Sequence, residues 1–182
     1  DNRIVYAGAQ FTRGERFYEL FAARLEYRYV DGGEVRAEQR IVTPAIGLRW
    51  QDGWGATAAI GPTFVSREEE GARNEDNDSV GLTIKGSVYS APGPITRELL
   101  ASFTTIDRIL WGRARILRAA GSHFSFGAEL VGMGGEQAHS YGAGLVLGVA
   151  GRLGRLGLAL GYERSTNREH TPYGGIELSA FF

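Results

Sequence analysis

The most regular feature of this sequence is an alternation, with a period of two, of apolar residues with polar or small ones. In the segment from Phe17 to Val30, the odd positions are mostly apolar and the even positions after the first turn are charged. The odd set contains Phe21, Ala23, Leu25, Tyr27 and Tyr29, and the even set contains Arg24, Glu26 and Arg28. Because successive side chains of a β-strand point to opposite faces, this period predicts a strand with one apolar and one charged face.

The same period recurs along most of the chain and predicts an all-β fold. Further strands are predicted at residues 4–13, 40–50, 54–66, 80–88, 98–104, 110–117, 124–132, 141–149 and 156–164, and a last one ends at Phe182. Helix signals are weak. Residues 95–109 are compatible with a helix after Pro94, although Leu99, Ala101 and Phe103 fit a strand equally well.

The period alone does not decide whether the apolar faces meet a core or a membrane, since soluble barrels and sandwiches alternate too. In residues 141–149, large apolar residues alternate mainly with glycine, so turning the large residues inward would leave mostly glycine outside. The last strand carries Ile176, Leu178, Ala180 and Phe182 on one parity, which is typical of outer-membrane barrels. We therefore expect an antiparallel up-and-down transmembrane β-barrel in the bacterial outer membrane.

The connections between the predicted strands alternate in length. Reading back from Phe182, placed at the periplasmic rim, the longer and more charged connections are 165–172, 133–139, 67–79 and 31–39, with 105–108 as a short exception. The shorter ones are 151–155, 119–122, 91–94 and 51–53. This pattern predicts long extracellular loops and short periplasmic turns. It gives 11 strands, within an expected range of about 10 to 12, and we favour 12 for the complete barrel because bacterial barrels normally have even numbers.

The composition excludes several classes of protein. The 182 residues suit one domain, 1–182, and contain no cysteine, which excludes disulfides and thiolate chemistry. A formal net charge of -1 gives no reason to expect a nucleic-acid partner. No apolar run is long enough for a spanning helix, which argues against a helical membrane protein.

Charged residues on the predicted inward parity form the candidate site. They are the lumen-lining set Arg24, Glu26, Arg28, Arg49, Lys85, Arg113, Arg115, Glu129, Glu163 and Glu177. In the preferred interpretation these charges pair across a narrow lumen and fill it. In the alternative, the arginines line a pore or groove that handles a polar, anionic or sugar-like solute.

A catalytic site is the weaker interpretation. His123, Ser125 and Glu129 share one parity on one strand, and a histidine beside a serine and a carboxylate suggests nucleophilic catalysis. The spacing resembles that of outer-membrane lipid A deacylases, but their site faces lipid near the outer rim, whereas these residues are predicted to face the lumen near a periplasmic turn. We therefore expect no enzymatic activity and no catalytic residues.

Candidate metal ligands are also weak. His139 and His170 lie in predicted loops without a second ligand at suitable spacing, and the acidic run Glu68 to Glu70 is typical of a solvated loop. We expect neither a metal ion nor a cofactor.

Four short motifs carry a family resemblance. They are Tyr6-Ala7-Gly8-Ala9, Trp111-Gly112-Arg113-Ala114-Arg115, Gly127-Ala128-Glu129-Leu130-Val131-Gly132 and Gly157-Leu158-Ala159-Leu160-Gly161-Tyr162. In this order the chain resembles the BcsS family of cellulose-biosynthesis proteins over nearly its whole length. The resemblance implies a Gram-negative outer-membrane barrel associated with cellulose production. We therefore expect a role in the secretion or anchoring of cellulose or another exopolysaccharide. The resemblance also implies a further strand ahead of Tyr6 and no catalytic residues.

The implied partners are outer-membrane lipid and lipopolysaccharide, with a polysaccharide or secretion machinery as a further partner. A small porin or channel for polar solutes is the alternative function, and a lipid hydrolase is the third.

Overall fold

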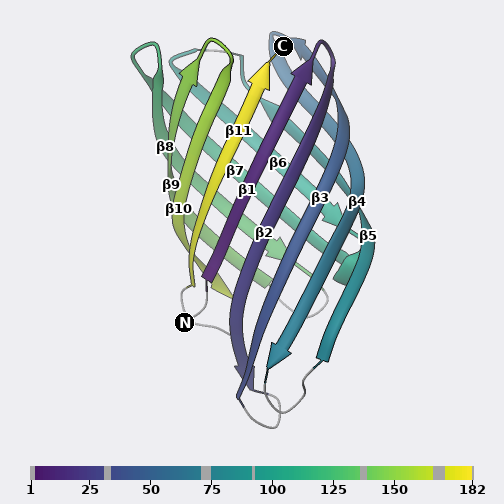
Figure 1. The fold of residues 1–182 in the computed structure, drawn as a ribbon. Helices are drawn as coiled ribbons and strands as arrows, with labels where there is room; N and C mark the ends of the chain where they lie inside the picture. The colour runs from purple at the N-terminus through teal and green to yellow at the C-terminus, as the bar shows by residue number, and fades with distance from the viewer. Residues whose placement is uncertain are drawn as a thin grey trace.

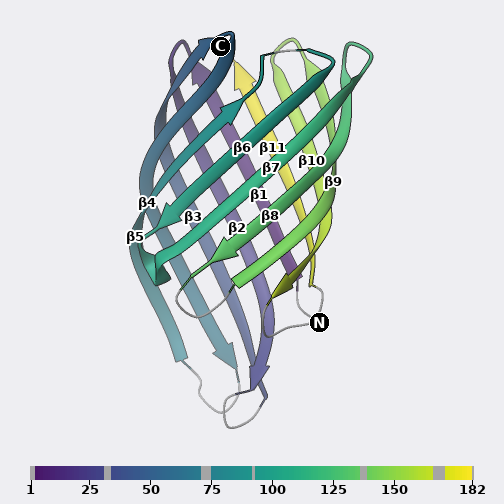
Figure 2. The ribbon, with the colours of Figure 1, turned by 180° about the vertical axis from the view of Figure 1, so that it is seen from behind.

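The computed structural model describes residues 3–30, 34–70, 75–91, 93–135, 139–165 and 171–181, and only the backbone at 27–30, 34, 75–76, 165 and 181. Within these ranges the strands form one closed β-barrel (Figure 1). Seen from behind, the strands on the opposite wall complete the same cylinder (Figure 2). The expected all-β barrel is confirmed.

Eleven strands are described. They are β1 (Arg3–Arg13), β2 (Arg16–Val30), β3 (Glu34–Asp52), β4 (Trp54–Glu70), β5 (Glu75–Tyr89), β6 (Ile95–Thr104), β7 (Ile109–Ala120), β8 (Phe124–Gly134), β9 (His139–Gly151), β10 (Gly154–Ser165) and β11 (Thr171–Phe181). A short 3-10 helix, η1 (Ile106–Arg108), connects β6 to β7. The alternating pattern at residues 98–104 therefore forms a strand, and the helical alternative for residues 95–109 is wrong apart from this single turn.

Strands that follow one another in the chain pair antiparallel, as expected of an up-and-down barrel. The closing pair is different, because β1 and β11 run parallel in a register from Ile4 opposite Tyr173 to Thr12 opposite Phe181. An odd number of alternating strands requires one such pair. The expectation of a wholly antiparallel barrel is corrected at this seam, and the described strands close without a twelfth.

The strands β2 to β5 are longer than their neighbours and extend the wall at the end of the barrel away from the C-terminus (Figures 1 and 2). Most of the two segments expected to be long loops, 31–39 and 67–79, is therefore strand. The charges there are compatible with strands because they pair across strands on the outer face. Arg24 contacts Glu38 at 2.7 Å, and Arg40 contacts Glu68 at 3.5 Å.

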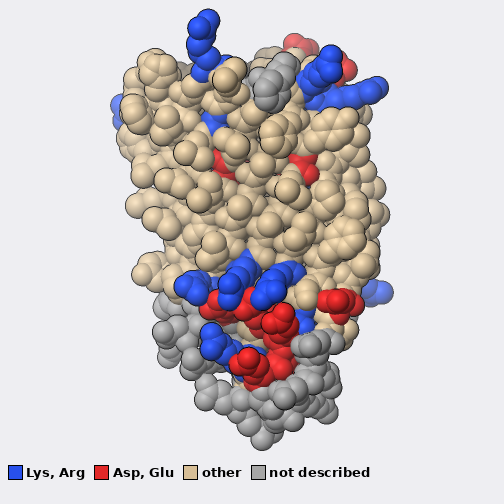
Figure 3. All heavy atoms as spheres, viewed as in Figure 1, with Lys and Arg blue, Asp and Glu red and all other residues tan. Residues whose placement is uncertain are grey.

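The outer face of the barrel is apolar. Each of the eleven described strands exposes at least one large apolar side chain, such as Val5, Leu20, Ile46, Ile60, Ile84, Leu99, Ile116, Leu130, Leu145, Leu160 and Ile176. The largest exposed fractions among them are 71% at Leu145 and 70% at Leu160. Figure 3 shows the resulting surface, broad and nearly free of charge, with charged side chains gathered toward the two ends. This surface is called the apolar belt below.

The two faces of β2 are the reverse of the prediction. Phe17 is 1% exposed, and Phe21 stacks on Tyr6 with 6.1 Å between ring centroids, so the odd positions point inward. Tyr18 and Leu20 are the exposed apolar residues of this strand. The prediction failed because both faces of β2 carry aromatic residues. The strand also continues past the apolar belt, where its outward side chains include the ion-paired Arg24 and Glu26.

The β3–β4 ladder is interrupted at Pro44. Regular pairing stops at Val42 opposite Phe64 and resumes at Ile46 opposite Ile60, because proline cannot donate a backbone hydrogen bond. Gly61 lies next to this interruption. A Cβ atom there would be 1.9 Å from the carbonyl oxygen of Pro44, so only glycine allows this approach of the two backbones.

Candidate functional site

The centre of the barrel interior is occupied by two buried arginines. Arg113 and Arg115 lie two residues apart on β7, so both point to the same face, and they are 9% and 6% exposed. Both reach Glu177 on β11. Arg115 donates to its two carboxylate oxygens from Nη1 at 2.6 Å and from Nη2 at 2.8 Å, and Arg113 donates from Nη1 at 2.5 Å. Because β7 and β11 are not neighbours in the barrel, these bonds cross its interior.

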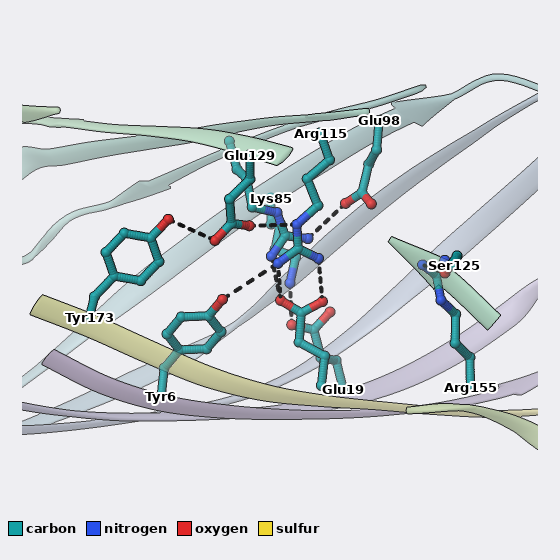
Figure 4. Close-up of polar contacts among 11 residues, drawn as sticks. Tyr6, Glu19, Lys85, Glu98, Arg115, Ser125, Glu129, Arg155 and Tyr173 are labelled. Atoms are coloured by element: carbon teal, nitrogen blue, oxygen red, sulfur yellow. Dashed lines mark hydrogen bonds and ion pairs between the residues drawn. The ribbon is translucent and has the colours of Figure 1, made fainter. Parts of the chain in front are cut away.

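Two further carboxylates complete the ion-pair cluster. Arg113 Nη2 donates to Glu98 at 2.7 Å, and Arg115 Nε donates to Glu129 at 2.6 Å. Glu129 is 1% exposed, and its other oxygen accepts a 2.8 Å hydrogen bond from the hydroxyl of Tyr173. Buried charges are tolerated when they are paired and hydrogen-bonded, and here each carboxylate has a guanidinium partner. Figure 4 shows Arg115 between the Glu98, Glu129 and Tyr6 side chains.

A second bridge crosses the interior between β2 and β5. Lys85 on β5 forms an ion pair with Glu19 on β2, although β3 and β4 separate these strands in the barrel order. Both side chains are labelled beside the cluster in Figure 4. The two bridges therefore cross the interior between two different pairs of non-neighbouring strands.

Hydroxyl groups line the interior wall over the neighbouring strands β3 to β6. The row of threonines consists of Thr43, Thr63, Thr83 and Thr104, one from each strand, and successive hydroxyls are 3.0, 2.5 and 2.6 Å apart. Each hydroxyl satisfies its neighbour, which explains how polar side chains are buried here without charge.

Comparison with protein families identifies this barrel. The family model described as cellulose biosynthesis protein BcsS matches residues 1–182, the whole chain. The chain belongs to the BcsS family. The resemblance inferred from the four motifs is thereby confirmed. No curated protein and no solved structure matches the chain.

In this BcsS-family barrel, most of the predicted lumen-lining side chains lie on the interior parity. Arg113, Arg115, Glu129 and Glu177 form the cluster, and Lys85 forms the second bridge.

Two more predicted side chains, Arg49 and Glu163, lie away from the BcsS-family cluster. Arg49 donates from Nε to the hydroxyl of Tyr89 at 2.9 Å. Glu163 is half-buried on the parity of the buried Ala159.

Three predicted lumen-lining residues on β2 need a separate account. Arg24 and Glu26 lie on the outer face, where Arg24 contacts Glu26 at 3.0 Å, so their assignment to the lumen is wrong. The side chain of Arg28 lies outside the described residues. The reversal of β2 explains the error, and it also explains why Glu19, at an odd position, is the residue that β2 contributes to the interior.

Sequence reasoning missed the partners Glu98, Tyr6 and Tyr173. A signal for Glu98 was present, because the apolar parity of β6 leaves Glu98 on the inner face. The tyrosines gave no such signal, since their inward orientation depends on the width of the interior and on small residues opposite them. Gly175 illustrates this, because a Cβ atom there would be 2.0 Å from the Tyr6 ring.

The three residues of the hydrolase interpretation are not arranged as a catalytic triad in this BcsS-family chain. His123 Nδ1 contacts the carbonyl oxygen of Ala150 at 3.1 Å, Ser125 accepts from Arg155 at 3.2 Å, and Glu129 serves the cluster. In the described part of the chain, each of the three candidate catalytic side chains thus has a different partner. Within the described ranges, no group of three or more His, Cys, Asp or Glu side chains is arranged to hold a metal ion. The described residues contain no helix long and apolar enough to cross a membrane.

Proposed function

We propose that this protein is an outer-membrane β-barrel of a Gram-negative bacterium that serves cellulose biosynthesis without catalysing a reaction. Its family is one of cellulose biosynthesis, and its fold is a closed barrel. To the family and the fold, the proposal adds a location in the outer membrane and a non-catalytic role. It also adds a place in the secretion or anchoring of cellulose or another exopolysaccharide.

The apolar belt is the observation that carries the proposal. Soluble monomers rarely expose contiguous apolar patches larger than a few hundred Å². Here large apolar side chains surround the barrel, and a hydrogen-bonded polar cluster lies in the interior beside buried apolar residues such as Leu117 and Val146. This is the inverse of a soluble barrel and matches the outward-apolar, inward-polar alternation of outer-membrane barrels.

The two ends of the barrel differ in a way that supports an orientation. The end at the C-terminus of β11 has short turns and is called the turn end below. The opposite end, called the extended end, carries the projecting parts of β2 to β5 and the outward ion pairs of Arg3, Arg24 and Arg40. Outer-membrane barrels have short periplasmic turns and longer extracellular segments, so we place the turn end in the periplasm.

The filled interior favours anchoring over conduction. Two guanidiniums, three carboxylates and the Lys85–Glu19 pair meet in a space that a glucan chain or a large solute would have to pass. The extended end, in contact with lipopolysaccharide and the outside, would then contact the polysaccharide or the secretion machinery. A small porin for polar solutes remains the second candidate because the cluster is polar and built on arginine.

Reconstitution tests the membrane assignment and separates the two candidates. We expect the purified protein to require detergent, to insert into lipid vesicles and to show strands tilted by about 35–45° in polarised infrared spectra. We also expect little conductance for large solutes in planar bilayers. A detergent-free soluble monomer would refute the membrane assignment, and large stable openings in the wild type would favour the porin.

A genetic experiment tests the cellulose role. We expect deletion of the gene in the bacterium that carries it to reduce cellulose retained at the cell surface, while cellulose synthesis by isolated membranes is unchanged. Complementation with the wild-type gene should restore retention. Unchanged cellulose retention in the deletion strain would contradict the proposed role.

A further inference from the structure

Outward arginines occur at both ends of the barrel, but among the described residues those that form ion pairs all lie at the extended end. At the extended end, Arg3 contacts Glu26 at 3.0 Å, and Arg40 contacts Glu38 at 2.7 Å. Figure 3 shows a mixed band of charged side chains of both signs at this end, directly beside the apolar belt. Carboxylates of the protein therefore compensate the positive charge of Arg3, Arg24 and Arg40 in this band.

The turn end carries a second set of arginines, called the turn-end arginines, which consists of Arg13, Arg16, Arg97, Arg118 and Arg152. All five are exposed, and among the residues that the structure describes none of them forms an ion pair. The acidic residues in the turns of this end are Glu15 and Asp52, and both are likewise without an ion pair in the described part of the chain. Among the described residues, this end therefore has more unpaired arginines than unpaired carboxylates.

Four of the turn-end arginines lie at the edge of the apolar belt. Each is two residues from an exposed apolar side chain on the same strand and therefore shares its outward face. The apolar neighbours are Phe11 for Arg13, Tyr18 for Arg16, Leu99 for Arg97 and Ile116 for Arg118. Their guanidinium groups can extend from the apolar surface to the polar boundary.

The register brings these arginines together in two pairs. Arg13 and Arg16 are direct cross-strand partners on β1 and β2. On β6 and β7, Arg97 is opposite Ile116, so Arg118 is its diagonal neighbour. Like charges directly opposite one another on a sheet are destabilising unless an anion lies between them. Each pair therefore presents two guanidinium groups that can bind one phosphate.

We propose that the turn-end arginines bind the phosphate groups of anionic phospholipids in the leaflet at this end of the barrel. A phospholipid satisfies both features at once, because its phosphate meets the guanidinium pair while its acyl chains cover the adjacent apolar belt. The inference rests on the proposed membrane location and deepens it. It assigns a phospholipid leaflet to the turn end, where in the described part of the chain none of the exposed arginines is ion-paired, whereas the outer-face ion pairs lie at the extended end.

Lipid titration in neutral detergent tests the inference. Phosphatidylglycerol or phosphatidylcholine is added to the wild type, to the variant R13Q/R16Q/R97Q/R118Q and to the matched control R3Q/R40Q, and bound lipid is counted by native mass spectrometry. We expect the wild type and the control to retain phosphatidylglycerol over phosphatidylcholine, and the fourfold variant to retain it at least about tenfold more weakly, with the difference shrinking at high salt. Equal retention by the fourfold variant, an equal loss in R3Q/R40Q, or full displacement of phosphatidylglycerol by inorganic phosphate would overturn the inference.

Insertion of the same three proteins into phosphatidylcholine vesicles separates this inference from the membrane assignment. We expect all three to insert, because the apolar belt is unchanged. Failure of the wild type to insert would refute the membrane location itself, whereas normal insertion without phosphatidylglycerol preference would refute only the arginine site. Circular dichroism of each variant confirms that its strand content is retained.

Discussion

Arg115 and Glu177 are separated by 62 positions in the chain, yet two hydrogen bonds of 2.6 and 2.8 Å connect them across the interior of the barrel. The contact joins β7 directly to β11, which share no ladder. Two strands that otherwise contact only their ladder neighbours are thus connected through the interior of the barrel. Such a bridge favours a fixed barrel cross-section and a filled interior.

Replacing Glu177 with Gln should destabilise the protein strongly. The change removes the carboxylate that accepts three charge-assisted hydrogen bonds from Arg113 and Arg115, although Glu98 and Glu129 still pair with these arginines, so we expect a loss of about 3 kcal/mol in the free energy of unfolding. Urea unfolding in lipid vesicles measures this loss. Ser179→Ala, on the inner face of the same strand, is the control and should change stability by less than about 0.5 kcal/mol. Equal stability of the two variants would show that the cluster contributes nothing.

An arginine in the middle of the apolar belt should be costly. Leu160 on β10 is 70% exposed, and Leu160→Arg should reduce stability in a bilayer by about 2–4 kcal/mol if the residue lies near the midplane. Leu153→Arg is the control, because Leu153 is 73% exposed but lies in the turn between β9 and β10. An arginine at the membrane boundary should cost at most about 1 kcal/mol. The expectation fails if both variants unfold at the same urea concentration as the wild type.

Gly61→Ala should disturb the pairing of β3 with β4. The new Cβ atom would meet the carbonyl oxygen of Pro44 at 1.9 Å, and since this neighbour is backbone, the strands must separate. Overpacking of this kind typically costs about 1–3 kcal/mol. At Gly112, on the outer face, the nearest atom is 3.7 Å away, so Gly112→Ala should be nearly neutral. Thermal unfolding compares the two, and a neutral Gly61→Ala would mean that the strands have room to spare at Pro44.

The carboxyl of Glu38, at the extended end, should have a lowered pKa. A hydrogen bond from Arg40 Nε to Glu38, together with the charge of Arg24, holds the pKa of the Glu38 carboxyl below its ordinary value of 4.5. Because the folded-state pKa is lowered, the stabilisation is present above the ordinary value and is lost as the pH falls through the folded-state pKa. A carboxyl-detected NMR titration should show this low pKa, and Arg40→Gln should raise it. An unchanged pKa in Arg40→Gln would assign the shift to another cause.

Alternation in the sequence was sufficient to predict the closed barrel and most strand positions, but not every face. On β9 and β11, glycine or a single charge on one parity made the outward face unambiguous. On β2, Phe17 and Phe21 lie on one face and Tyr18 and Leu20 on the other, so both faces carry large apolar or aromatic side chains. A period of two does not show which of these faces points outward. The inward face is decided by packing across the interior, which no local pattern contains.

The contacts of the cluster were beyond prediction for a similar reason. Alternation placed Arg113, Arg115, Glu129 and Glu177 on inward faces, but which side chains meet depends on the register and stagger of the closed barrel. The continuation of the strands at the extended end was also missed, because charged residues such as Glu38 are typical of loops when they are considered singly. Their cross-strand partners become visible only when β2, β3 and β4 are aligned.

The parallel seam between β1 and β11 has a consequence for how the chain folds. Ile4 meets Tyr173, so the pairing that closes the cylinder joins segments almost a whole sequence apart and forms only after β11 has been synthesised. Contacts of such long range form slowly, because much chain entropy is lost before they contribute. Until then the sheet is an open ribbon with two unsatisfied edges and an apolar face, which is the form most prone to aggregate. The chain is therefore most prone to aggregate in the interval before β1 pairs with β11.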